Sequence, residues 1–154
     1  MTIEATIDTI LRGYLKLQLE EAGAAKAKRI RIVERRLRDF LETHAEQTLC
    51  SCNTTILQAE RQFDPSGAFA RTMNADHLIV ALELFLRGPV ERDDHLLLET
   101  YLDFIEGLAF GLVRGGVVDL DELHEVVDDL ADLLAWWTSR AAKMKREKRM
   151  RRVR

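Results

Sequence analysis

The stretch DLDELHEVVDDLADLLAWWTSRAAKM, residues 119–144, decides the fold class of this 154-residue chain. Its apolar residues alternate spacings of three and four, the seven-residue repeat of a helix that packs along a nearly straight seam. They are Leu120, Leu123, Val127, Leu130, Leu134, Trp137, Ala141 and Met144. Asp119 and Glu122 form an acidic version of the capping box that begins helices. The pattern predicts one long helix that starts at Asp119.

Four further helices are predicted upstream, because apolar residues recur there at helical spacing between caps and breakers. In chain order they are Ile3 to Leu17 with an end before Gly23, Ala24 to Leu49, a helix capped by Asn74 and ending at Arg87, and Val90 to Arg114 before the stop Gly115-Gly116. An irregular insert separates the second from the third. In it, Ile56 to Phe63 is expected to form a short helical piece before Asp64-Pro65-Ser66-Gly67 turns the chain.

No strand is predicted, because alternation of polar and apolar residues never lasts beyond a few positions. We therefore expect an all-α bundle of about five main helices. Residues 1–142 are expected to form a single helical domain, and residues 143–154 a basic tail that continues or frays from the last helix. The segment His95 to Trp137 resembles helical bacterial domains of unknown function. This resemblance does not point to any particular activity.

Composition points to a globular chain, since 47% of the residues are hydrophobic, 32% are charged and only 2 are proline. The longest apolar stretch, Leu78 to Leu86, is interrupted by Glu83 and is shorter than the ~20 residues of a membrane span. The first residues lack the basic flank and apolar core of a signal peptide. Cys50 and Cys52 flank one serine, a spacing that disfavours a disulfide. We expect a cytoplasmic protein.

The net charge of −3 conceals two strongly basic stretches. Residues 26–39 contain seven basic side chains and residues 143–154 contain eight, whereas the rest of the chain carries 8 bases against 23 acids. Clustered bases favour binding to nucleic acid of any sequence, or to anionic lipid headgroups. The residues predicted for nucleic acid are Arg29, Arg31, Arg35, Arg36, Lys145, Arg146, Lys148, Arg149, Arg151 and Arg152. The alternative for the tail is a solvated helix end, where bases also complement the backbone dipole.

Residues 119–132 carry seven acidic side chains and no base. They are expected to face the basic helix of the same chain or of a second copy, because opposite charges on neighbouring helices lower repulsion. A basic partner of another kind is the alternative.

The candidates for chemistry are sparse. His44, Cys50 and Cys52 lack a local fourth ligand for zinc. The side chains of His95, Glu99, Asp103 and Glu106 share one side of a predicted helix, but the paired Glu-x-x-His motifs of di-metal bundles do not occur, so a solvated face is the favoured interpretation. No nucleophile elbow, phosphate loop or dinucleotide motif is present. We expect no cofactor, and no catalytic motif indicates an enzyme; a metal enzyme of the bundle interior is the alternative. Gly107, Gly111 and Gly115 are interpreted as a smooth surface for close helix packing.

These observations favour a non-enzymatic interaction or regulatory module that self-associates through its last helix as a homo-oligomer. A helical protein partner is the alternative. The predicted interface residues are Leu130, Leu134, Trp136 and Trp137. The adjacent tryptophans lie about 100° apart around the helix, so only Trp137 fits the apolar seam and Trp136 lies at its flank. Association with nucleic acid is the second hypothesis.

Overall fold

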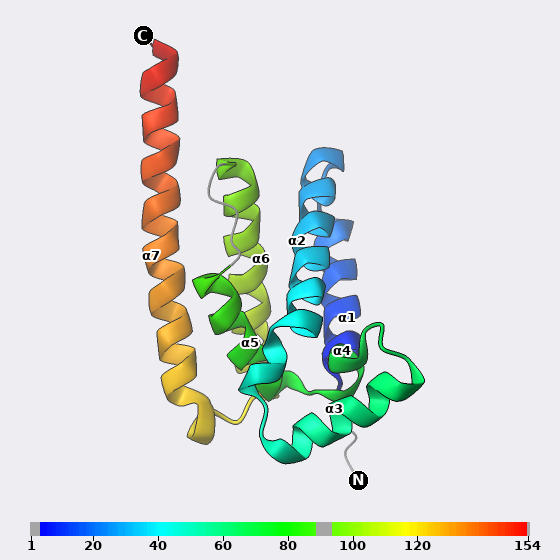
Figure 1. Cartoon of the computed structure of the whole chain (residues 1–154). Helices are drawn as coiled ribbons and strands as arrows, with labels where there is room; N and C mark the ends of the chain where they lie inside the picture. The colour runs from blue at the N-terminus through cyan, green and yellow to red at the C-terminus, as the bar shows by residue number, and fades with distance from the viewer. Residues whose placement is uncertain (1–3, 89–93, 154) are drawn as a thin grey trace.

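A computed structural model describes residues 4–88 and 94–153 of the chain, and these residues fold into helices joined by short connections (Figure 1). In chain order the elements are α1 (Ile7–Glu20), α2 (Ala24–Thr43), the 3₁₀ helix η1 (Ala45–Thr48), α3 (Ser51–Phe63), α4 (Ala68–Thr72), α5 (Ala75–Arg87), α6 (His95–Arg114) and α7 (Leu120–Val153). The described residues contain no strand, only an isolated bridge between Thr6 and Asn74. The prediction of an all-α protein is confirmed.

The long helices lie side by side, with α7 at one edge of the bundle and α1 at the other (Figure 1). α7 packs on α5 and α6, α6 packs on α2, and α2 packs on α1. α3 and α4 close one end of the bundle (Figure 1). α7 runs antiparallel to α6 and extends past its first turn, so the end of α7 projects beyond the other helices (Figure 1).

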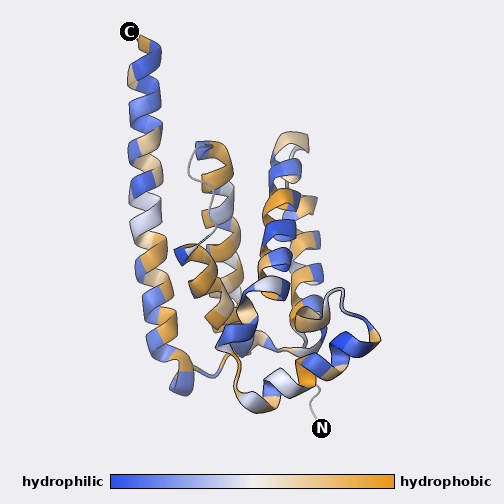
Figure 2. Cartoon of the chain, in the orientation of Figure 1, coloured by the Kyte–Doolittle hydropathy of each residue, from blue (hydrophilic) through white to orange (hydrophobic). Residues whose placement is uncertain are grey.

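The core lies mainly between α1, α2, α4, α5 and α6, where the apolar faces of these helices meet (Figure 2), and α3 and α7 add a few buried residues to it. Its centre is aromatic: Phe85 has ring-centroid distances of 5.2 Å to Phe40 and 5.8 Å to Tyr101. α5 buries seven of its 13 residues, as expected for the nearly all-round apolar helix that the sequence predicts. α7 buries only three of its 34 residues.

Local signals place most helix ends correctly. Asn74 caps α5 in a capping box with His77, and Asp94 caps α6 by accepting from the backbone N–H groups of Leu96 (3.0 Å) and Leu97 (3.1 Å). The helix predicted from Val90 therefore begins at His95, and residues 90–93 lie outside the described part of the chain.

The helix predicted as Ala24 to Leu49 is shorter than expected. α2 ends at Thr43, and the chain continues through η1 to Leu49, whose backbone is extended. Two threonine hydroxyls lie at this break: Thr43 Oγ1 donates to Asp39 O (2.8 Å) and Thr48 Oγ1 donates to Ala45 O (2.7 Å). Such local bonds compete with continuation of a helix. The short piece predicted from Ile56 is in turn longer, since α3 begins at Ser51.

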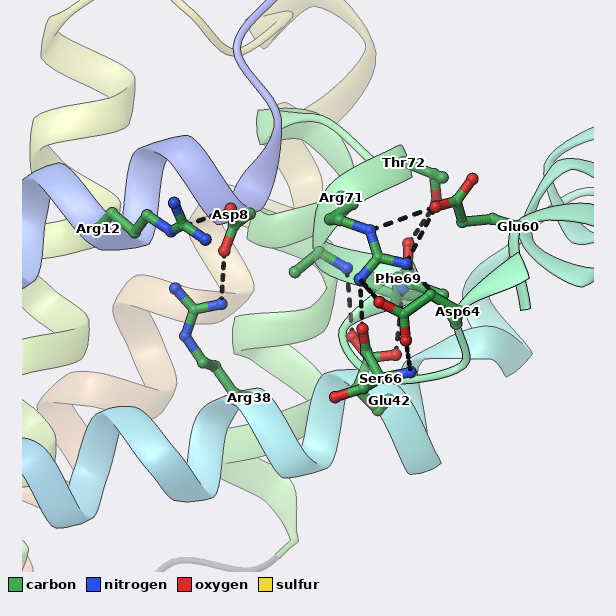
Figure 3. Close-up of polar contacts among 12 residues, drawn as sticks. Asp8, Arg12, Arg38, Glu42, Glu60, Asp64, Ser66, Phe69, Arg71 and Thr72 are labelled. Carbon is green, nitrogen blue, oxygen red and sulfur yellow. Dashed lines mark hydrogen bonds and ion pairs between the residues drawn. The ribbon is translucent and has the colours of Figure 1, made fainter. Parts of the chain in front are cut away.

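α4 was not predicted, and contacts from distant segments hold it (Figure 3). The Glu42 carboxylate accepts from the backbone N–H groups of Phe69 (3.1 Å) and Ala70 (3.3 Å), at the first turn of α4. Arg71 donates to the Glu60 carboxylate (3.0 Å) and to Asp64 O (2.8 Å), which fixes the predicted turn at residues 64–67. This polar cluster joins α2, α3 and α4, so its role is to stabilise the fold.

Close packing at the helical glycines is confirmed at one position. A Cβ atom on Gly107 would lie 2.4 Å from the hydroxyl oxygen of Tyr14, which donates to Phe104 O (2.8 Å). Gly111 has open space around its Cα, and a Cβ on Gly115 would meet only carbonyls of its own helix. The interpretation of all three glycines as one packing surface is therefore wrong for Gly111 and Gly115.

Candidate interaction surface on the last helix

The sequence before α7 sets its start and direction. Gly116 has a φ of 68°, a left-handed conformation that glycine adopts without strain, and it turns the chain after α6. Asp119 Oδ1 then accepts from the backbone N–H groups of Asp121 (3.1 Å) and Glu122 (3.4 Å), and the Asp119 N–H donates to Asp76 Oδ1 (2.9 Å). The predicted cap is present, and it is tied to the start of α5.

The inner face of α7 attaches the helix to the bundle. Leu130, Trp137 and Ala141 are buried, and the Trp137 Nε1–H donates to Leu86 O (3.0 Å) near the end of α5. The last carbonyls of a helix lack donors within it, so the indole supplies one. Of the four residues predicted as an interface, Leu130 and Trp137 thus pack inside the chain, Leu134 is half-buried, and Trp136 is exposed.

An apolar groove of about 540 Å³ runs along the α6 side of α7. α6 contributes Ala109, Phe110 and Val113, and α7 contributes residues between Val127 and Thr138. Phe110 is 57% exposed. The sequence did not predict Phe110 as a surface residue, because it falls outside the apolar stripe of its helix; a lone aromatic residue off that stripe, between Gly107 and Gly111, is the only signal that the sequence holds.

A second groove, of about 560 Å³, lies on the α5 side of α7, and Trp136 stands at its edge. The Trp136 ring meets Trp137 edge-on at a centroid distance of 4.9 Å, and the Arg140 guanidinium lies 5.3 Å from the Trp136 centroid. With 54% of its surface exposed, Trp136 offers a large, pre-positioned aromatic surface. Arg87 and Asp132 also line this groove.

The charges of α7 are separated along its length. All seven acids of residues 119–132 are exposed, as are all the bases from Lys143 to Arg152. The acidic half does not face α2, which lies beyond α6 from α7 (Figure 1). Among the described residues, no ion pair joins these acids to a base of α2; Arg38 of α2 instead pairs with Asp8 of α1 at 2.9 Å (Figure 3). The expected pairing of the acidic segment with α2 within one chain is wrong, and pairing with a second copy stays a prediction.

The two basic stretches flank the first half of α6. On one side, Arg29 donates to Thr100 Oγ1 (3.3 Å) from α2. On the other, Lys145 pairs with Glu99 (3.6 Å) and Lys148 lies 3.4 Å from His95 Nδ1.

Two of the predicted bases of α2 lie away from α6. Arg36 contacts α6, because it donates to the Tyr101 hydroxyl (2.9 Å), whereas Arg31 and Arg35 line a pocket beside Ser66 and Gly67. The predicted bases of α7, namely Lys145, Arg146, Lys148, Arg149, Arg151 and Arg152, are all exposed. The structure thus brings part of the predicted basic set to one end of the bundle.

The candidates for chemistry do not assemble. Within residues 4–88 and 94–153, no three His, Cys, Asp or Glu side chains gather as a metal site. His44 stacks on Phe40, and Cys50 and Cys52 are exposed thiols. No helix among the described residues has the length and hydropathy to cross a membrane.

No known protein family, curated protein or solved structure matches this chain. The surface of α7 is therefore interpreted from its own residues.

Proposed function

We propose that this protein is a non-enzymatic helical interaction module that self-associates through α7. One observation carries the proposal: α7 is a 34-residue helix that packs on α5 and α6 through three buried residues and a flank of partly buried ones, while its outer face, which includes Trp136, stays exposed. An exposed helix face that carries a large aromatic side chain is a surface on which a second helix can pack.

Trp136 is the anchor of this platform. Tryptophan is enriched among the residues that dominate the binding energy of protein interfaces. Leu134, half-buried beside the α6 groove, widens the apolar surface, whereas Leu130 and Trp137 hold α7 in place beneath it. Of the two tryptophans, Trp137 therefore supports the platform and Trp136 contacts the partner.

The test is light-scattering mass across a size-exclusion peak, for the full chain over a range of concentrations. Wild type is expected to form a discrete dimer or larger assembly, and Trp136→Glu is expected to return it to the monomer. Phe63→Glu is the matched control, since Phe63 is 88% exposed at the end of α3, away from α7. A wild type that stays monomeric at every concentration refutes the proposal.

Association with nucleic acid is a second candidate function, favoured by the bases that flank the first half of α6. The end of α7 projects from the bundle (Figure 1), and Arg149, Arg151 and Arg152, which belong to it, are exposed. Such binding releases counterions, so its affinity for duplex DNA would fall steeply with salt. Affinity that ignores salt would refute it, and so would affinity that survives Arg151→Glu together with Arg152→Glu.

A further inference from the structure

One exposed stripe of α7 carries acidic side chains toward its first end and basic side chains toward its last. Its positions alternate spacings of four and three, so they line up along one side of a helix. All are exposed, and in order they are Glu125, Asp129, Asp132, Trp136, Ser139, Lys143, Arg146 and Met150. We call this set the α7 stripe. Its first three residues are acidic, its centre is Trp136 and Ser139, and bases follow.

We propose that two copies of this chain pair through the α7 stripe in an antiparallel arrangement, with the acidic half of each helix against the basic half of the other. This inference rests on the proposed self-association and adds its direction and register. The partner is a second copy of this chain, because an α7 stripe that runs in the opposite direction places bases opposite the acids of the first stripe.

A single antiparallel register places every stripe residue opposite another and pairs Asp129 and Asp132 with bases. If Asp129 lies opposite Arg146 of the second copy, then three residues forward on one helix and three back on the other place Asp132 opposite Lys143. Four further residues place Trp136 opposite Ser139, whose small side chain leaves room for the indole. The parallel arrangement would instead set acid against acid and base against base, which is repulsive.

The same register covers the part of α7 that its own bundle leaves bare. The helix is about 51 Å long at 1.5 Å per residue, and Lys148, which lies 3.4 Å from His95 Nδ1, makes its last polar contact with α6 among the described residues. Because the register is centred near the middle of α7, the projecting last turn of each copy lies along the first turns of the other. Met150, which is 71% exposed, then lies beside Glu125 of the second copy.

None of the charged stripe residues has an ion-pair partner among the described residues of its own chain. Asp129 and Arg146 are separated by about 26 Å along a continuous helix, so they cannot pair within one chain. Any energetic coupling between these two positions must therefore act between copies, which makes the proposal testable by charge reversal.

The experiment uses two full-length double variants: Asp129→Lys with Asp132→Lys, and Lys143→Glu with Arg146→Glu. Each variant alone opposes like charges at four contacts per dimer. Exposed ion pairs contribute modestly, so we expect the dimer dissociation constant to rise by about tenfold or more. Mixing the two variants restores opposite charges at every contact. The mixture is expected to form a heterodimer with about the wild-type affinity, measured by light-scattering mass.

Matched controls carry the same changes in net charge at exposed sites away from α7. They are Glu20→Lys with Glu21→Lys, and Lys26→Glu with Lys28→Glu, and both are expected to dimerise like wild type.

The outcomes separate this inference from the proposed function. A monomeric wild type overturns both. A wild-type dimer that neither double variant weakens overturns the antiparallel register and leaves self-association standing. Weakening of both variants without rescue on mixing also overturns the register, as does a wild-type assembly that nuclease treatment dissolves. Loss in each variant and recovery in the mixture supports it.

Discussion

Replacing Trp137 with alanine is expected to destabilise the fold severely, whereas the same change at its neighbour Trp136 is expected to spare it. Trp137 is 3% exposed and Trp136 is 54% exposed, although the two side chains start from adjacent residues. Truncation of a buried tryptophan to alanine costs roughly 3–5 kcal/mol, because apolar contacts are lost and a cavity remains. Trp137→Ala also removes the indole donor to Leu86 O.

The loss converts to a large shift in melting temperature. For a chain of this size each kcal/mol lowers Tm by roughly 2–4 °C, so Trp137→Ala is expected to lower it by about 6–20 °C. Trp136→Ala changes a half-exposed side chain and is expected to cost about 1 kcal/mol or less. Trp137→Phe, which keeps a ring and removes the hydrogen bond, should fall between, at roughly 1–3 kcal/mol.

The assay is thermal unfolding followed by helical circular dichroism at low protein concentration, where dissociation of an assembly adds least to the transition. Light-scattering mass measures self-association of the same variants. Trp136→Ala is expected to weaken self-association while leaving Tm nearly unchanged. The reasoning is refuted if Trp137→Ala melts within 2 °C of Trp136→Ala.

Three further predictions concern the bundle. Gly107→Ala is expected to destabilise by about 1–3 kcal/mol in urea unfolding, because its methyl group would displace the Tyr14 hydroxyl, whereas Gly111→Ala in open space should be neutral or stabilising. Burial, aided by Asp103, raises the pKa of Tyr14 from about 10 to about 12. The unfolded chain therefore ionises first, so stability is full below pH 10 and falls as the pH rises toward 12. Tyr14→Phe should remove that part of the decline. Burial lowers the pKa of His77 below 6.5, so stability falls as the pH drops through that value, and His77→Gln should flatten this acid limb in a pH series.

The helix ends that the sequence predicts correctly are those that depend on nearest neighbours. Asn74 and Asp119 cap helices through side chains that reach only two or three residues along the chain. α4 escaped prediction because a five-residue helix has almost no periodicity to read, and it is capped by Glu42, which lies 27 residues earlier. No local pattern contains that contact.

Two of the four residues predicted for the interface pack inside their own chain for a related reason. A seven-residue apolar repeat shows that one face of a helix will be covered, and it does not show whether the cover comes from the same chain. In α7 the repeat is satisfied by α5 and α6, which bury Leu130 and Trp137. Trp136 was placed correctly at the flank, because its position relative to Trp137 follows from helix geometry alone.

The charge separation of α7 has a simpler explanation than association, namely the helix dipole, which favours acids at the first turn and bases at the last. The dipole accounts for Asp121 and Arg152, which lie in those turns. Its influence falls off within about one turn, whereas Asp132 lies 12 residues after the start of α7 and Lys143 lies ten residues before its end. The dipole therefore does not account for the acids and bases that lie within a few residues of Trp136. The proposed antiparallel copy of α7 does, because it would place Lys143 of one copy beside Asp132 of the other.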